Sequence, residues 1–182
     1  MKENIIQFNS DIAKGEDEVR IAFYANIGFF IEVAQIFEFN LRKLICYEMS
    51  VKEIEKGDIT KERIEKICAK YDKYYYDTYS KKLTLGKLIE KTRKETSISE
   101  DNFSFLEKLN DFRVNIVHKI FQNNTISHNL GDAELVREYT QRCIVPMTDE
   151  AIEMNDNLKE FIYQYRDKLR SYKMEVGLLI SE

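Results

Sequence analysis

Apolar residues recur along most of this chain at spacings of three and four, the periodicity of one face of an α-helix. The pattern predicts helices over about 17–49, 61–79, 84–94, 97–122, 132–144 and 149–174. Short polar segments separate these runs, and there is one proline in the whole sequence. We therefore expect an all-α fold: one domain over residues 1–182, built as an up-and-down helical bundle.

Particular residues mark some of the expected helix ends. Ser99 followed by the acid Glu100 is typical of a helix N-terminus, where an oxygen caps free N–H groups and negative charge is favoured. Pro146 lacks an N–H group, so we expect it to end the helix over 132–144. Thr148 is then expected to cap the last long helix.

The segment 17–49 is apolar around most of its circumference. Its polar positions form a narrow face: Tyr24, Gly28, Gln35, Glu38 and Arg42. A helix of this kind needs burial on more than one side, which indicates either a central helix or a dimer interface. Because charged and polar residues also interrupt its most hydrophobic window, we do not expect it to span a membrane.

Composition limits the classes of function. The chain has 182 residues, 33% of them charged, and a formal net charge of −4, which argues against general coating of nucleic acid. The three cysteines, Cys46, Cys68 and Cys143, form no metal-binding pair and are typical of reduced core residues. No signal peptide is visible, so we expect a cytoplasmic protein. The sequence shows no metal-ligand cluster and no phosphate-binding glycine loop, so we expect no metal or cofactor.

The segment 111–121 holds the residues best suited to chemistry. Arg113 offers a planar fork of donors for phosphate, and His118 can exchange a proton near neutral pH. In a regular α-helix Asn115 and His118 share a polar stripe, whereas Arg113 is rotated by about 140° from His118, towards the apolar face. Arg113 would then pair with an acid such as Glu32 or Glu38, extend to the rim, or require a distorted helix.

This spacing and its surroundings resemble the Arg-x4–6-His motif of the HEPN family. The likeness also includes the run 105–112 before the motif and the segment 83–89, and it covers about 17–122. It implies a homodimeric all-α fold and a metal-independent endoribonuclease of toxin–antitoxin or abortive-infection systems. His118 would be the base, Arg113 would stabilise phosphate charge, and Asn115 would assist. Residues 132–182 would add C-terminal helices.

The chain departs from the family pattern directly after the arginine. Active members usually carry a polar residue there, whereas this chain has Val114, with Asn115 one position later. Two alternatives therefore stay open beside the nuclease. One is a catalytically silent HEPN-type module that binds a partner protein or a nucleotide. The other is an unrelated helical bundle in which the motif occurs by chance.

A second candidate for RNA binding is a basic segment beside a tyrosine-rich one. The basic residues are Lys81, Lys82, Lys87, Lys91, Arg93 and Lys94. Aromatic rings can stack on bases while cations contact phosphates. The alternative is a solvated helix face next to half-buried tyrosines. The other histidine, His128, lies in a polar loop without neighbours at metal-ligand spacing.

Overall fold

The computed structural model describes residues 15–80, 83–120 and 132–179. These residues form helices and no strand, which confirms the all-α prediction. They divide into two compact units: unit 1 holds residues up to Gln35 and Lys108–Glu153, and unit 2 holds Ile36–Glu107 and Met154 onwards. Each unit is described by itself below. The expected single domain stays a prediction.

The helices agree closely with the sequence pattern. In chain order they are α1 (Glu16–Ile54), α2 (Lys61–Ser80), α3 (Leu85–Glu95), α4 (Glu100–Val114), the π-helical turn η2 (Asn115–Lys119), α6 (Ala133–Tyr139), the π-helical turn η3 (Thr140–Ile144) and α7 (Val145–Glu175). As predicted, the helix of the motif begins directly after Ser99. Helices α1, α4 and α7 contribute residues to both units.

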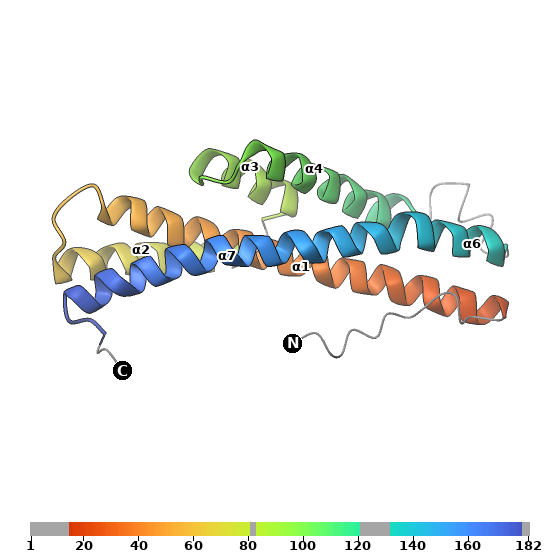
Figure 1. Ribbon diagram of the computed structural model, residues 1–182, viewed down its shortest axis with the longest axis horizontal. Coiled ribbons are helices and arrows are strands. Elements are labelled where there is room, and N and C mark those ends of the chain that lie inside the picture. Colours follow the sequence, from red (N-terminus) through yellow and green to blue (C-terminus); the bar gives the residue numbers. More distant parts are fainter. Residues whose placement is uncertain (1–14, 81–82, 121–131, 180–182) are drawn as a thin grey trace. The chain divides into compact units, whose positions relative to one another are not determined.

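Unit 2 is held together at one end by a cluster that draws on three helices. Figure 1 shows α2 lying beside the C-terminal parts of α1 and α7. The buried members of this cluster are Cys46, Val51 and Ile54 of α1, Ile64, Ile67 and Tyr71 of α2, and Leu169 of α7. Burying apolar side chains of this size stabilises a fold by roughly 1.5–3 kcal/mol each.

The turn between α1 and α2 is closed by one arginine. Arg63 donates to the backbone carbonyls of Ile54 at 2.9 Å and Asp58 at 2.8 Å, and also to that of Glu53. These carbonyls lie at and just beyond the end of α1, where the last turn of a helix has no intrahelical donors. At the end of α7, Gly177 takes a φ of 71° and the Leu178 N–H bonds to the Lys173 carbonyl at 2.8 Å, which is a Schellman motif.

The core of unit 1 comes from the N-terminal half of α1, the motif helix and the α6–α7 region. Phe23, Phe30, Leu109 and Ile144 are fully buried there. The rings of Phe30 and Phe112 meet edge to face, with centroids 5.0 Å apart. Such ring pairs favour this geometry and add to the gain from burial.

The prediction that Pro146 ends a helix is wrong. The helical backbone continues from η3 into α7 through Pro146, and Thr148 is not a cap: its hydroxyl donates to the Ile144 carbonyl at 2.7 Å. Proline in a helix removes one hydrogen bond and clashes with the carbonyl four residues earlier. The wider π turn η3 lies directly before Pro146 and gives that carbonyl room. The helix therefore changes its hydrogen-bond register at this point and does not end.

Helix α1 also meets, by length and composition, the test for a membrane-spanning segment, and 33% of its most apolar window is buried. A core helix of a soluble protein passes the same test, so this is weak evidence. The expectation of no membrane span stays a prediction. Of its polar positions, Tyr24, Gly28 and Gln35 are exposed, whereas Arg42 is only 6% exposed and pairs with Glu38 at 3.6 Å.

Candidate functional site

The motif residues lie where the α-helix changes to a π turn. Arg113 is in the last turn of α4, and Asn115 and His118 are in η2. A π turn bonds each residue to the fifth one along, so it takes roughly 4.4 residues against 3.6 in an α-helix. One or two of the five steps from Arg113 to His118 stay α-helical, so the rotation between the two residues falls from about 140° to roughly 70–85° by the same geometry. The sequence left three arrangements open for Arg113: an ion pair with an acid, extension to the rim, or a distorted helix. The distorted helix is present in the backbone.

Arg113 is half-buried, in agreement with its place near the apolar face. Its Nε atom is out of contact with solvent, and its side chain is engaged with another group of the chain. The nearby Leu109 and Ile116 are 0% and 2% exposed. A guanidinium held in this way has a fixed orientation, which favours both a structural role and a precise contact with an anion.

His118 and Asn115 lie on the outside of the turn. Both are exposed, as are Asp111 and Lys119. Asp111 and Gln122 also belong to the polar stripe that helical spacing predicts for Asn115 and His118, and Gln122 lies outside the described residues. Neither His118 nor Lys119 has a hydrogen bond or ion pair in the part of the chain that the structure describes. Their polar atoms are thus open to a ligand from solution.

Lys119 was missed by the sequence reasoning, and so was the π turn itself. A signal for the turn was present: Val114, Ile116 and Val117 are β-branched residues, which fit an α-helix less well than straight-chain residues do. This weakens the regular helix at the position where an extra residue must be accommodated. Lys119 adds a positive charge next to His118, which is the charge that phosphate requires.

The basic segment is less available than its sequence indicates. Lys94 pairs with Glu90 at 2.6 Å, and Lys91 pairs with Glu95 at 3.3 Å. Arg93 pairs with Glu107 at 2.9 Å and lies over the Phe103 ring. Lys87 is exposed, and Lys81 and Lys82 lie outside the described residues. Most of this positive charge is therefore neutralised by acids of the same unit.

Of the described tyrosines near the basic segment, Tyr71 is buried and Tyr74 and Tyr75 are half-buried. Tyr71 donates to Glu53 at 2.8 Å, and Lys91 lies over the Tyr74 ring at 4.5 Å. Tyr76 differs, because 69% of it is exposed. The surroundings agree better with a solvated, ion-paired helix face than with an open stacking surface.

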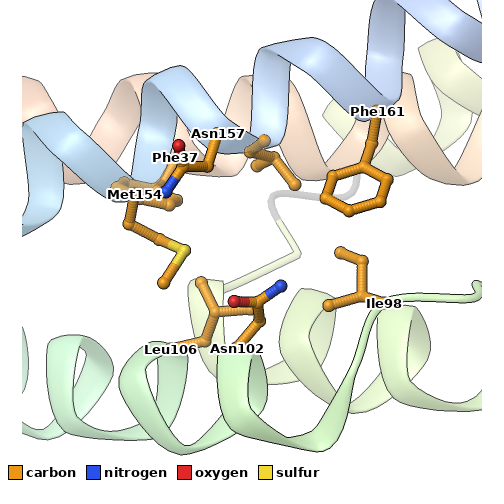
Figure 2. A pocket seen from close by; sticks show the side chains of 8 residues that line it. Phe37, Ile98, Asn102, Leu106, Met154, Asn157 and Phe161 are labelled. Atoms are coloured by element: carbon orange, nitrogen blue, oxygen red, sulfur yellow. The ribbon is translucent and has the colours of Figure 1, made fainter.

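Unit 2 also holds two hollows. One lies between α1, α4 and α7 and has a volume of about 10 Å³, room for about one water molecule. Figure 2 shows Asn102 and Leu106 of α4 facing Met154 and Phe161 of α7 across it. The other is a groove of about 420 Å³, lined by Met49, Lys52, Glu53, Lys56, Tyr71 and Glu95. The lysines and glutamates of that groove largely pair within the unit, so it has no clear charge preference.

Comparisons with models of protein families, with curated proteins and with solved structures found no match to this chain. In the described residues no group of three or more histidine, cysteine, aspartate or glutamate side chains is placed to hold a metal ion. His128 lies outside those residues. The site is therefore defined by its own geometry: an oriented arginine, an exposed histidine and a neighbouring lysine and asparagine on one irregular turn.

Proposed function

We propose that this protein is a HEPN-like endoribonuclease that needs no metal, with its site on the π turn η2. The observation that carries the proposal is the π turn, because it reduces the rotation between Arg113 and His118 from about 140° to roughly 70–85°. Isolated π turns inside α-helices occur frequently at functional sites. The resemblance of the motif to the HEPN family supports the same residues for the same roles.

The chemistry would be cleavage by the RNA itself, assisted by the protein. His118 takes the proton from a ribose 2′-OH, and the 2′ oxygen forms a bond to the adjacent phosphorus. The bond from phosphorus to the 5′ oxygen breaks, and that oxygen is protonated from solvent. Arg113 stabilises the charge that develops on the phosphate oxygens. Asn115 and Lys119 hold the substrate beside the histidine.

The proposal includes a homodimer in the cytoplasm, acting in a toxin–antitoxin or abortive-infection system. Both parts follow from the family resemblance. A dimer also fits the exposed apolar side chains of α1, since Ile21 is 57% exposed. An antitoxin or another protein partner would keep such a nuclease inactive until it is needed.

The alternative is a catalytically silent module of the same type. Two observations favour it: Val114 stands where active family members carry a polar residue, and Arg113 is half-buried and already engaged within the chain. In that case Arg113 stabilises the fold, and the exposed turn binds a protein or a nucleotide without catalysing cleavage.

The experiment that separates the two is an RNA-cleavage assay with EDTA present, on a broad panel of single-stranded and structured RNAs. The nuclease should cut in EDTA and leave ends with a 2′,3′-cyclic phosphate and a 5′-hydroxyl, since those are the products of 2′-OH attack. Cleavage that stops in EDTA contradicts the proposed mechanism. No cleavage on any RNA of the panel favours the silent module.

A further inference from the structure

The two π turns of unit 1 lie on neighbouring helices. Turn η2 ends the described part of the motif helix, and η3 joins α6 to α7. Within unit 1, α4 runs in one direction and α6, η3 and α7 return beside it in the other (Figure 1). An ion pair fixes the alignment, because the Lys108 Nζ atom of α4 lies 2.7 Å from the Glu150 Oε2 atom of α7. Both residues are exposed, so they mark the solvent side of the line along which the two helices meet, which we call the α4–α7 seam.

Counting from this ion pair places Asn115 and Arg142 on opposite sides of the seam at a similar level. Asn115 follows Lys108 by about two helical turns, so it lies within about 40° of the Lys108 direction. In a regular α-helix Arg142 would be rotated by about 80° from Glu150. The smaller rotation per residue in η3 reduces this to roughly 25–45°. Because both side chains are exposed, Asn115 and Arg142 border the solvent side of the seam within about one helical turn of each other.

The other residues of the candidate site continue around the motif turn from Asn115. At the same rotations per residue, Lys119 lies on the Asn115 side of the turn, His118 comes next, and Arg113 follows on the far side of His118. Arg142 stands across the seam from Asn115 and Lys119. Positive side chains are therefore present on both sides of the histidine that the proposed function uses as its base.

Arg142 is accessible to a ligand although it has a partner. Its Nη1 atom lies 2.8 Å from the Glu138 Oε1 atom, and the two side chains are 77% and 48% exposed. An exposed ion pair between residues four apart on a helix holds its members weakly. A guanidinium also has five N–H donors, so it can bind a phosphate with those that the carboxylate leaves. Arg93 of α3 differs, because its side chain is 39% exposed and lies over the Phe103 ring.

We propose that Arg142 binds the RNA phosphate next to the one that is cleaved, and that the substrate is a single strand crossing the motif turn from Arg113 to Arg142. This rests on the proposed function and adds a binding residue and a substrate class to it. Arg113 stabilises charge on the phosphate at the cleaved bond, whereas Arg142 holds the neighbouring phosphate on the Asn115 side. Because Arg142 touches no reacting atom, it contributes to binding and to the placement of the strand.

The arrangement favours a single strand over a duplex. Arg113, Lys119 and Arg142 lie around one turn, where they can contact adjacent phosphates of one strand. Recognition of double-stranded RNA by shape extends over about 16 base pairs. A protein with a net charge of −4 offers little positive surface for so long a contact. Attack by the 2′ oxygen also requires that it line up with the leaving 5′ oxygen, which the regular backbone of a duplex prevents.

RNA binding provides the first test. The probe is a short single-stranded RNA with methylated 2′ hydroxyls, which binds without being cleaved. Arg142→Ala should weaken binding about three- to tenfold and lower the slope of log Kd against log salt concentration by about 0.7, the value for one phosphate contact with a single strand. Arg170→Ala, which removes another exposed arginine, is the matched control and should change affinity by less than about twofold. The same RNA as a duplex should bind at least about tenfold more weakly, and equal binding would overturn the assignment to a single strand.

Cleavage kinetics separate a binding role from a structural one. In Arg142→Ala the KM for RNA should rise by about the same factor as the Kd, while kcat stays within about twofold of wild type. The thermal midpoint should not change, since the side chain is 77% exposed. Arg142→Lys keeps the charge and should recover part of the affinity. A fall in kcat at unchanged KM would contradict a role in binding alone.

Glu138 allows a test in the opposite direction. Glu138→Gln removes the carboxylate that competes with phosphate for Arg142, so RNA binding should tighten about two- to threefold more than in Glu153→Gln, which removes another exposed acid of unit 1. In the Arg142→Ala background the two glutamine variants should bind RNA equally, because no arginine is left to be released. A gain specific to Glu138→Gln that persists without Arg142 would contradict the proposal.

The outcomes separate this inference from the proposed function. RNA cleavage with equal Kd and KM in Arg142→Ala and Arg170→Ala overturns the inference and leaves the nuclease standing. Binding that depends on Arg142 without cleavage of any RNA supports the phosphate contact and contradicts the nuclease. Wild-type protein that binds no RNA at about 50 mM salt, where phosphate contacts are strong, overturns both.

Discussion

The sequence offers two candidates for RNA binding, the motif turn of unit 1 and the basic helix α3 of unit 2. The charged side chains of these two regions have different surroundings in the structure. On α3, Lys91, Arg93 and Lys94 are all paired with acids. On the motif turn, His118 and Lys119 are exposed and have no partner among the described residues. A run of positive residues therefore says little about available charge until the neighbouring acids are known.

The two regions also differ in backbone regularity. Helix α3 is a regular α-helix whose buried residues, Leu85, Leu88, Ile89 and Thr92, repeat at helical spacing. The motif helix changes its hydrogen-bond register inside the motif. Such a register change gives up regular helical bonds, so it persists only where the surrounding structure holds it. We infer that α3 serves stability and the motif turn serves chemistry.

The largest effect on both stability and activity is expected at Arg113. Arg113→Ala should lower the free energy of unfolding by about 1–3 kcal/mol, because a charged side chain with a partner is lost from a half-buried position. RNA cleavage should fall steeply as well. Arg113→Lys should recover part of the stability without recovering cleavage, since lysine lacks the planar fork. Urea unfolding and cleavage rates measure the two effects, and an unchanged unfolding midpoint in Arg113→Ala would place the arginine in open solvent.

On α3 the expected changes are smaller and affect stability alone. Arg93→Ala should cost about 0.5–1 kcal/mol, because it removes the ion pair with Glu107 and the contact with the Phe103 ring. Lys87→Ala, the exposed control on the same helix, should stay within about 0.5 kcal/mol of wild type. RNA affinity measured by filter binding should change less than about threefold in both. A tenfold loss of affinity in either variant would move the RNA-binding site to α3.

The ion pairs of unit 2 also predict a modest sensitivity to acid. Hydrogen bonds from Lys70 and Tyr71 lower the pKa of Glu53, and those from Lys168 and Tyr172 lower the pKa of Glu55. A lowered folded-state pKa contributes stability that is present above the ordinary value of 4.5 and is lost as the pH falls through the folded value. The thermal midpoint should therefore decrease as the pH is lowered below 4.5. The decrease should be smaller in the double variant Glu53→Gln/Glu55→Gln. An equal drop in the double variant would assign acid sensitivity to other carboxylates.

The smallest effect concerns the thiols. Burial raises the pKa of Cys46 to about 12, with nearby Asp72 and Glu95 acting in the same direction. Burial also raises the pKa of Cys68, to a lesser extent. Because the thiolate is the reactive form, Cys46 should be modified last when the folded protein is treated with iodoacetamide at pH 8, which peptide mass spectrometry can follow. Early modification of Cys46 would show that the α1–α2 cluster opens readily.

Most of the helical framework could be predicted from the sequence, because the apolar spacing is regular. The helices expected over about 61–79 and 84–94 are observed as Lys61–Ser80 and Leu85–Glu95. Both π turns escaped prediction, since a register change leaves almost the same apolar spacing around it. The prediction that Pro146 ends a helix was wrong for a related reason. The effect of a proline depends on whether the preceding turn can widen, and the apolar spacing does not indicate this.

The candidate site could be predicted only in part. The choice of Arg113, Asn115 and His118 followed from residue chemistry and spacing, and the exposure of Asn115 and His118 follows from helical geometry. The orientation of Arg113 relative to His118 depends on the π turn. The neutralisation of α3 depends partly on Glu107, which is 14 residues away from Arg93 in the sequence and reaches it only in the fold. The catalytic role of the candidate site at Arg113, Asn115 and His118 stays a prediction.

The most direct measurement is the rate of RNA cleavage in EDTA for three proteins side by side: wild type, His118→Ala and Lys119→Ala. The two substitutions are adjacent, both at exposed positions, so neither should alter the fold. If His118 is the base, its loss should slow cleavage by about 10²–10⁴-fold, whereas loss of Lys119 should slow it less than about tenfold. Cleavage by His118→Ala at the wild-type rate would contradict the account.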